Sequence, residues 1–286
     1  MRVFINGISS WIGYYLGQYI GEAYPEWELI GTYRYTLPEN PNNIKIEEVK
    51  IGSNLDSVEL MWHYKPKVFI NLTRGEQDAD MMFHEQMIKT LNKINCHYAY
   101  ASTFNVCDGD PNHDHSEDAP VNARSEYGIF KGQCEEMLRN HSENYSIFRF
   151  GAIHGWIPYR ASRTELFLRS LQAGKTSKIN DLLIQNRPFT MNVAGMIADI
   201  IANGGKGMFN LGTTDANSEV DFHRNLAKAF GYPENLIEVE SSSACNAFMV
   251  PKKVFELTGD KWKKTQKELI DEIRGIPEFQ KYVHSK

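Results

Sequence analysis

Tyr127 and Lys131 stand four residues apart near the middle of the chain. The apolar pattern predicts a helix over residues 126–140, and this spacing places both side chains on one helix face. Tyr282 and Lys286 have the same spacing, so the spacing alone decides little. The alternative interpretation is a tyrosine that packs and a lysine that is solvated. The surrounding sequence favours a catalytic role for Tyr127 and Lys131.

A predicted strand over residues 97–102 precedes this helix and ends in Ser102-Thr103. Sites in α/β proteins form at the carboxyl ends of strands. These residue types suit the reduction of a carbonyl, because hydride transfer leaves an alkoxide that needs a proton. Tyr127, with an ordinary pKa of about 10, can donate that proton if a cation lowers its pKa. We expect Lys131 to supply this charge and to hold the nicotinamide ribose. We expect Thr103, or alternatively Ser102, to hydrogen-bond the carbonyl oxygen.

The chain begins with a predicted strand over residues 2–5, followed by a turn from Gly7 to Gly13 and a helix. A dinucleotide needs such a tight turn, with the helix N-terminus directed at its pyrophosphate. Ser10 stands where a glycine is usual, but its small side chain still allows close approach and its hydroxyl can cap the helix. A plain strand-to-helix turn is the alternative. The predicted cofactor contacts here are Gly7, Ser10, Trp11, Ile12 and Gly13.

The second predicted strand, over residues 27–33, is followed by Arg34. An acidic residue at this place would hydrogen-bond the adenosine ribose of NAD, and none is present. The guanidinium of Arg34 suits the 2′-phosphate of NADP. We therefore expect NADP(H) to be preferred, with NAD(H) as the other possibility. A solvated loop arginine is the alternative interpretation of Arg34.

Predicted strands and helices alternate along the first two thirds of the chain. This order predicts an α/β fold, a Rossmann doubly wound parallel sheet with helices on both faces. After Gly151 the pattern loosens and predicts a smaller C-terminal lobe that binds the substrate. The predicted strands span residues 2–5, 27–33, 44–51, 67–72, 97–102, 145–150 and 207–211. The first predicted helix starts at Trp11. The other predicted helices span residues 57–63, 81–94, 126–140, 164–173, 193–201, 218–230 and 263–273.

Composition and charge exclude several classes of protein. The 286 residues are 42% hydrophobic, enough for one large domain or for a domain with a smaller lobe. A formal net charge of −5 without a long basic run argues against nucleic acid as a partner. No apolar stretch has the length of a membrane span, and no signal-peptide core is present, so a cytoplasmic protein is expected. The four cysteines are widely spaced, as is typical of reduced thiols, and His113-Asp114-His115 predicts a polar loop rather than a metal site.

Several segments together resemble the extended short-chain dehydrogenases/reductases of the NAD-dependent epimerase/dehydratase family, and among them the dTDP-4-dehydrorhamnose reductase-like enzymes. The resemblance covers nearly the whole chain. Residues 100–109 resemble the family's strand and loop around its Ser-Thr pair. Ala119-Pro120, followed by Tyr127-Gly128-x-x-Lys131, resembles the start of its catalytic helix. The other segments that resemble the family are 68–72, 148–155 and 189–193.

The resemblance implies a nicotinamide cofactor and a nucleotide-sugar substrate held between two lobes. It also implies that Asn71 and Leu72, at the end of the fourth strand, lie along the cofactor. The implied activity is the NAD(P)H-dependent reduction of a 4-keto-6-deoxy nucleotide sugar. Two alternatives stay open: a nucleotide-sugar epimerase that uses bound NAD, and a non-catalytic NAD(P)-binding redox sensor. The implied domains are a Rossmann domain over 1–154 plus about 190–213 and a substrate-binding lobe over 155–189 and 214–286.

Phe104 and Asn105 depart from the family pattern directly after Thr103. The reductases often carry Asp-Tyr there and the 4,6-dehydratases carry Asp-Glu. Phenylalanine and asparagine cannot perform acid–base work, which argues against dehydration. Thr103, Phe104 and Asn105 are still the expected substrate contacts. Enzymes similar to GDP-fucose synthase add a cysteine and a histidine, but Cys107 lies too far past Thr103 to match, and Cys107 and His154 are expected to be structural.

The two phosphates of a nucleotide sugar need a cation from the second half of the chain. Arg187 is the first choice, because it lies near the point where the chain returns to the cofactor domain. Arg163 and Lys175 are weaker candidates, and a surface loop charge is the alternative interpretation of Arg187. The resemblance also implies a homodimer in which the predicted helices 81–94 and 126–140 pair across the interface.

Overall fold

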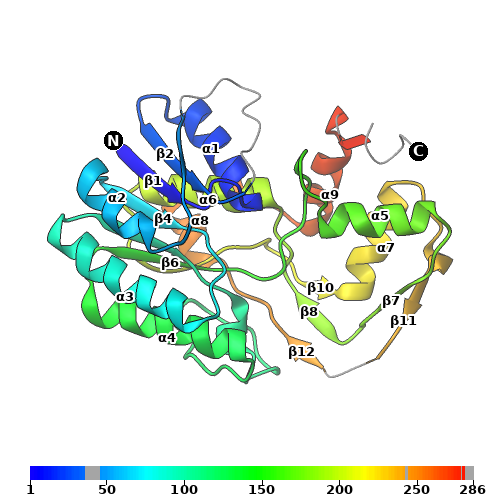
Figure 1. The fold of residues 1–286 in the computed structure, drawn as a ribbon. Helices are drawn as coiled ribbons and strands as arrows, with labels where there is room; N and C mark the ends of the chain where they lie inside the picture. The colour runs from blue at the N-terminus through cyan, green and yellow to red at the C-terminus, as the bar shows by residue number, and fades with distance from the viewer. Residues whose placement is uncertain (36–45, 242–243, 278, 281–286) are drawn as a thin grey trace.

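The short apolar runs of the first half form one parallel sheet, as the alternating pattern predicts. The computed structural model describes residues 1–35, 46–241, 244–277 and 279–280. Seven parallel strands have the order β3-β2-β1-β4-β5-β6-β9. The predicted Rossmann-type α/β fold is confirmed (Figure 1). The strands are β1 (Arg2–Asn6), β2 (Glu28–Tyr33), β3 (Ile46–Lys50), β4 (Val68–Asn71), β5 (His97–Ala101), β6 (Tyr145–Arg149) and β9 (Gly207–Asn210).

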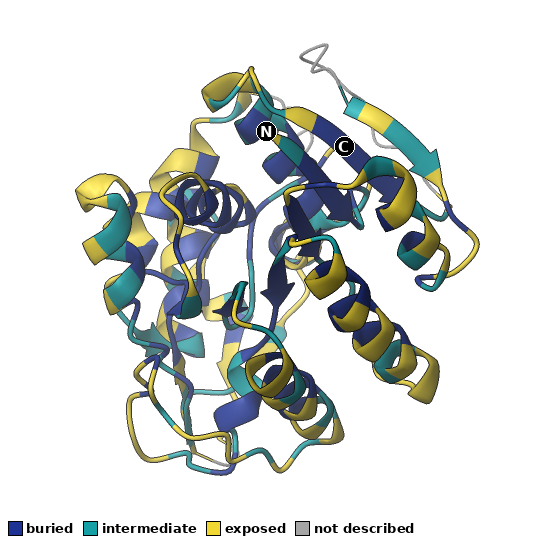
Figure 2. Ribbon diagram, turned by 90° about the vertical axis from the view of Figure 1, so that its left-hand side faces the viewer, coloured by how far each residue is buried: buried dark blue, intermediate teal, exposed yellow. Residues whose placement is uncertain are grey.

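Helices cover both faces of this sheet, because the strand residues that point to either side are apolar. In β1, Val3 and Ile5 belong to the core with α1 and α6, whereas Phe4 belongs to the core on the opposite face. Figure 2 shows the strands buried between helices whose outer surfaces are exposed. One face carries α1 (Trp11–Ala23), α6 (Thr190–Ala202) and α8 (Lys252–Thr258), and the other α2 (Asp56–Tyr64), α3 (Asp78–Lys93) and α4 (Glu126–His141).

A second lobe stands beside the carboxyl ends of the strands and has its own apolar core (Figure 1). Its helices are α5 (Arg163–Gln172), α7 (Glu219–Ala229) and α9 (Gln266–Arg274). A three-stranded sheet and a two-stranded sheet complete the lobe, with orders β10-β8-β12 and β11-β7. These strands, none of them predicted, are β7 (Ser177–Ile179), β8 (Leu183–Gln185), β10 (Asn217–Ser218), β11 (Ile237–Val239) and β12 (Cys245–Asn246).

The predicted helix over 263–273 begins too early. Asp260–Trp262 form a short 3-10 helix, η3, and α9 starts only at Gln266. Thr265 caps α9, since its side chain accepts from the backbone of Glu268 while the Glu268 carboxylate accepts from the backbone of Thr265. The first two residues of the predicted strand 44–51 lie outside the described residues. Among the described residues, no helix is long and apolar enough to cross a membrane.

Candidate functional site

A cleft of about 1070 Å³ opens at the carboxyl ends of β1, β2 and β4. This edge of a parallel sheet is where open α/β folds bind ligands. The first lobe contributes the glycine turn, the end of β2, residues 51–55 and the loop after β4. The second lobe contributes Tyr159 and Arg160. The cleft is thus built from segments that are far apart in the sequence.

The glycine turn needs glycine at both of its ends. Gly7 has a φ of +96°, which side chains other than hydrogen rarely allow. A Cβ at Gly13 would lie 2.3 Å from the carbonyl oxygen of Gly7, so only glycine permits this close approach. Ser10 caps α1, because its side chain accepts from the Gly13 backbone at 3.0 Å. Trp11 and Ile12 form the first turn of α1, and the Ile12 side chain points into the core.

The far end of the cleft contains Arg34, which lines it with Tyr35, Ser53 and Asn54. Hydrogen bonds from Ser53 and Gly52 lower the pKa of Asp56, and the charge of Arg34 contributes to the same shift. Arg34 is therefore close to the start of α2. Residues 51–55 were not among the predicted site residues, although they follow β3, whose end is adjacent to the end of β2 in the sheet.

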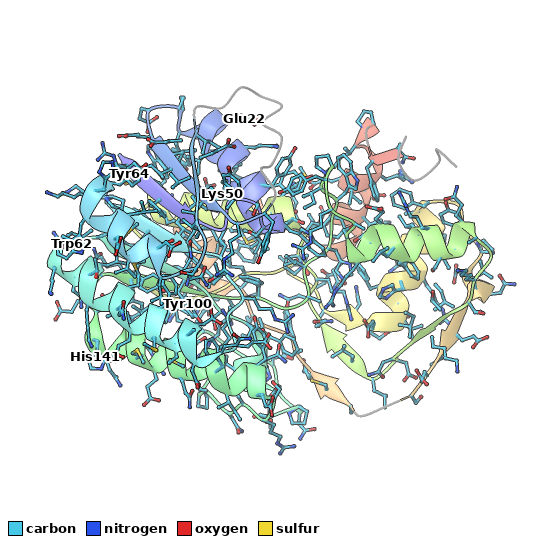
Figure 3. The ribbon with its side chains drawn as sticks, in the orientation of Figure 1. Glu22, Lys50, Trp62, Tyr64, Tyr100 and His141 are labelled. Atoms are coloured by element: carbon cyan, nitrogen blue, oxygen red, sulfur yellow. The ribbon has the colours of Figure 1, made fainter. Side chains whose placement is uncertain are left out.

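Lys131, in the second turn of α4, has a completely buried side chain. Its ammonium donates to the carbonyl oxygens of Ala101 at 3.0 Å and Thr73 at 3.4 Å, and so joins the ends of β5 and β4. The same nitrogen lies 4.7 Å from the centre of the Tyr100 ring, which is labelled in Figure 3. Burial lowers the pKa of Lys131 to about 8.

Tyr127 stands half-buried in the first turn of α4, facing the loop after β4. Its ring centre lies 5.9 Å from Nζ of Lys131 and 5.0 Å from Cζ of Arg74. Burial raises the pKa of Tyr127 above its ordinary value; Arg74 opposes this rise and Glu76 adds to it. The net shift of the Tyr127 pKa is upward, contrary to the expectation from the sequence, because burial outweighs the charge of Arg74. Arg74, which sequence reasoning missed, is the cation that acts most directly on this phenol.

The start of α4 packs against the turn that follows β5. A Cβ at Gly128 would lie 2.2 Å from the Asn105 carbonyl oxygen, so this glycine is required for the contact. Thr103 caps the short helix η1 (Phe104–Cys107): its hydroxyl donates to Oδ1 of Asn105 at 2.9 Å and accepts from the Asn105 backbone at 3.2 Å. Ser102 instead donates to the buried carboxylate of Glu135 at 2.5 Å. The Ser102 hydroxyl therefore has its hydrogen-bond partner in the interior of the first lobe.

Asn71 contributes to a buried hydrogen-bond chain rather than to the wall of the large cleft. Asn6 donates to Asn71 at 3.3 Å, and Asn71 donates to the Tyr98 hydroxyl at 3.2 Å. Tyr98 lies 2.8 Å from Nδ1 of His84, and Nε2 of His84 lies 2.9 Å from the Cys134 carbonyl oxygen. Since that carbonyl can only accept, Nε2 carries the hydrogen and Nδ1 accepts from Tyr98. This hydrogen-bond chain links the strand before the glycine turn to α4.

Leu72, the next residue after Asn71, does line the cleft.

Arg187 is fully buried in the second lobe, so the alternative of a surface charge is wrong. Its guanidinium donates to the carbonyl oxygens of Asn217 at 2.9 Å and Gln185 at 3.2 Å, and it stacks over the Phe222 ring. Its Nε has no hydrogen-bond partner within the described part of the chain. Burial lowers the pKa of Arg187 to about 10. Cys107 and His154 are buried too, as expected of structural residues.

The family model described as the RmlD substrate binding domain matches residues 74–274. The chain belongs to this family. The matched range includes Thr103, Tyr127, Lys131 and Arg187, whereas the glycine turn precedes it. No curated protein matches the chain in sequence.

Solved structures share the fold of the whole chain at low sequence identity. A dTDP-glucose 4,6-dehydratase from Bacillus anthracis, solved with NAD, has a TM-score of 0.78 at 14% identity and covers 99% of each chain. A dTDP-4-dehydrorhamnose reductase from the same organism, solved with NADP, has a TM-score of 0.75 at 15% identity and covers 95% of this chain and 98% of its own. A hypothetical dTDP-4-dehydrorhamnose reductase from Sulfolobus tokodaii has a TM-score of 0.78 at 15% identity, covering 92% and 97%. The fold is thus that of the extended short-chain dehydrogenases/reductases.

Proposed function

We propose that the chain binds NADP(H), and NAD(H) more weakly, in the cleft at the glycine turn and uses it to reduce a 4-keto-6-deoxy nucleotide sugar. The observation that carries this proposal is the position of Tyr127 above buried Lys131, on a helix whose start packs against the turn capped by Thr103. The membership in the RmlD family and the fold shared with nucleotide-sugar enzymes support the same conclusion.

The residues at the cleft fit a dinucleotide. Gly7 and Gly13 permit the tight turn between β1 and α1, and the first N–H groups of α1, at Trp11 and Ile12, suit a pyrophosphate. Arg34 would pair with the 2′-phosphate of NADP. Leu72 would line the cofactor path beyond β4, and Asn71 would support that path from the buried hydrogen-bond chain.

When bound, the cofactor supplies the hydride for the carbonyl carbon. Tyr127 donates the proton that the resulting alkoxide needs. Thr103 would hold the carbonyl oxygen by a hydrogen bond, with its hydroxyl hydrogen turned from Asn105 to the substrate. The ammonium of Lys131 stabilises the phenolate left on Tyr127, and it is mostly protonated at neutral pH because its pKa is about 8. Lys131 would also hold the nicotinamide ribose.

The substrate would lie between the turn after β5 and the second lobe. We propose Phe104 and Asn105 as contacts to the sugar, since they follow Thr103 directly. We propose Arg187 as the cation for the diphosphate, because it is a buried guanidinium with an unpartnered Nε and a Glu219 carboxylate only at longer range. Both assignments rest on the residues and on the family.

The test is a panel of 4-keto nucleotide sugars, incubated with the protein while NADPH absorbance is followed. A reductase consumes one NADPH per sugar reduced. A nucleotide-sugar epimerase would use the same Thr103, Tyr127 and Lys131 but would regenerate bound NAD and cause no net absorbance change. A redox-sensing binding protein would bind the cofactor and turn over none of the sugars, which would contradict the proposal.

We also propose that the chain forms a homodimer through α3 and α4, which the family resemblance implies. Multi-angle light scattering at micromolar concentration should give twice the mass of the 32.8 kDa chain. A monomer mass would remove this assignment without affecting the proposed reaction.

A further inference from the structure

A loop of the second lobe reaches across to the glycine turn of the first. It joins β6 to α5, and its tip is a tight turn in which Ile157 and Arg160 pair as an isolated antiparallel bridge. The turn fixes the backbone that carries Arg160. The Arg160 side chain is exposed and lines the large cleft together with Gly7 and Ser10.

Tyrosine contacts hold this loop against α1. The Tyr159 hydroxyl donates to the Ser9 carbonyl oxygen at 3.3 Å, in the glycine turn itself. The Tyr159 ring meets the Tyr14 ring edge-on at 5.4 Å, and the Tyr15 hydroxyl donates to the carbonyl oxygen of Trp156. The loop is therefore placed relative to α1 by contacts with the glycine turn and with two consecutive tyrosines near the start of the helix.

The Arg160 guanidinium stands over the first residue of α1. Its Cζ lies 5.8 Å from the centre of the ring of Trp11, which is the first residue of α1. No acidic side chain in the described part of the chain forms an ion pair with Arg160. A cation without a counter-ion, held at a helix N-terminus, is suited to an anion that both can bind.

We propose that Arg160 binds the pyrophosphate of the dinucleotide, so that the second lobe supplies a cofactor-binding residue. This inference rests on the proposed cofactor site. Arg34 and Arg160, which both line the cleft, would then contact different phosphate groups of the cofactor. Arg34, after β2, would contact the 2′-phosphate, which only NADP carries, whereas Arg160 would contact the pyrophosphate, which NAD and NADP share.

The experiment measures dissociation constants for NADPH, NADH and ADP-ribose by fluorescence or calorimetry, without any sugar substrate. Loss of a charge-assisted contact predicts that Arg160→Ala raises all three about tenfold or more. Arg34→Ala should raise only the constant for NADPH. Lys178→Ala, which removes an exposed cation elsewhere on the second lobe, is the matched control and should change none. Arg160→Gln provides a second variant that keeps most of the side-chain length.

The outcomes separate this inference from the proposed function. Suppose that the wild-type protein binds NADPH and that both Arg160 variants bind all three ligands as tightly as the wild type does. Arg160 then does not contact the pyrophosphate, and the proposed function stands. If Arg160→Ala weakens NADPH alone, the residue reads the 2′-phosphate and the assignment is overturned. If the variant binds ADP-ribose as tightly as the wild type but binds thymidine diphosphate, titrated as a fourth ligand, more weakly, Arg160 serves the sugar nucleotide instead. A wild-type protein that binds neither NADH nor NADPH would overturn the proposed function and the inference together.

Discussion

Glu135 and Arg149 form a bidentate ion pair in the interior of the first lobe, with Nη2 to Oε2 at 2.6 Å and Nε to Oε1 at 3.0 Å. Both side chains are at most 1% exposed. Arg149 also donates to the Ala119 carbonyl oxygen, and Ser102 donates to the Glu135 carboxylate. The pair therefore fixes α4, the end of β6 and the end of β5 in one arrangement, directly behind Lys131 and Thr103.

We expect Glu135→Gln to lower the free energy of unfolding by about 3–5 kcal/mol, because it leaves the buried guanidinium of Arg149 without a counter-charge. Urea denaturation at neutral pH measures the change. Glu136→Gln, at the exposed neighbouring position on α4, is the matched control and should stay within about 0.5 kcal/mol of the parent. Equal stabilities of the two variants would contradict the role assigned to the ion pair.

Tyr127→Phe should lower kcat by about 10²- to 10⁴-fold, because the variant keeps the ring and loses the proton donor. The dissociation constant for NADPH should change little. Steady-state kinetics on a sugar identified from the panel, together with a cofactor titration, measures both effects. Tyr145→Phe, which removes a hydroxyl at the start of β6, is the control. A Tyr127→Phe enzyme with the same kcat as the parent would exclude Tyr127 as the proton donor.

Arg187→Ala should raise KM for the nucleotide sugar strongly, because the diphosphate contributes binding energy remote from the carbonyl. The dissociation constant for NADPH should stay nearly unchanged. Removing a buried group with backbone partners should also lower the melting temperature, so KM is compared at a temperature where both proteins are folded. Arg187→Lys keeps the charge and should recover part of the affinity. Collapse of cofactor binding, or an unchanged KM, would assign Arg187 to the packing of the second lobe alone.

The buried His84 should make the protein less stable in mild acid. Burial lowers its pKa to about 4, whereas the unfolded chain titrates at about 6.5. As the pH falls, the unfolded state therefore binds the additional proton first. The contribution of His84 to the free energy of unfolding is fully present above pH 6.5 and is lost as the pH drops to about 4, by about 3 kcal/mol. His223, whose pKa burial also lowers to about 4, acts in the same direction.

His84→Asn should flatten the pH dependence of the unfolding free energy between pH 7 and pH 4.5, at a cost in stability at pH 7 from the lost hydrogen bonds. Urea denaturation at several pH values follows both. His63→Gln, an exposed position on α2, should leave the curve parallel to that of the parent. A His84→Asn curve that is also parallel would show that His84 does not titrate as its burial requires.

Local patterns in the sequence were enough to predict the large sheet. The strands around Phe4, Phe69 and Ile147 are short apolar runs between turn residues, and helical spacing identified α1 and α4. Gly7 and Gly13 were recognised because their roles depend on neighbours within one turn. The prediction that Ser10 caps α1 is confirmed by its hydrogen bond to Gly13.

Other features depend on contacts between distant parts of the chain and left no pattern. The small strands of the second lobe have two or three residues each, too few to show a period. Tyr159 meets Ser9 across 150 residues. The direction of the Tyr127 pKa shift depends on how deeply the phenol is buried and on Arg74, and neither follows from the Tyr-x-x-x-Lys spacing.

The last strand of the large sheet, β9, has a consequence for synthesis of the chain. It pairs with β6, but the ribosome makes it about sixty residues later, after α5 and α6. Until then the nascent chain carries six strands with an unpaired edge at β6. For most of that interval, until α6 has been made, the apolar side of the sheet beside α1 also lacks its cover from α6. A ribosome that stalls before residue 210 therefore holds an aggregation-prone intermediate, because the edge of β6 is left without its partner strand.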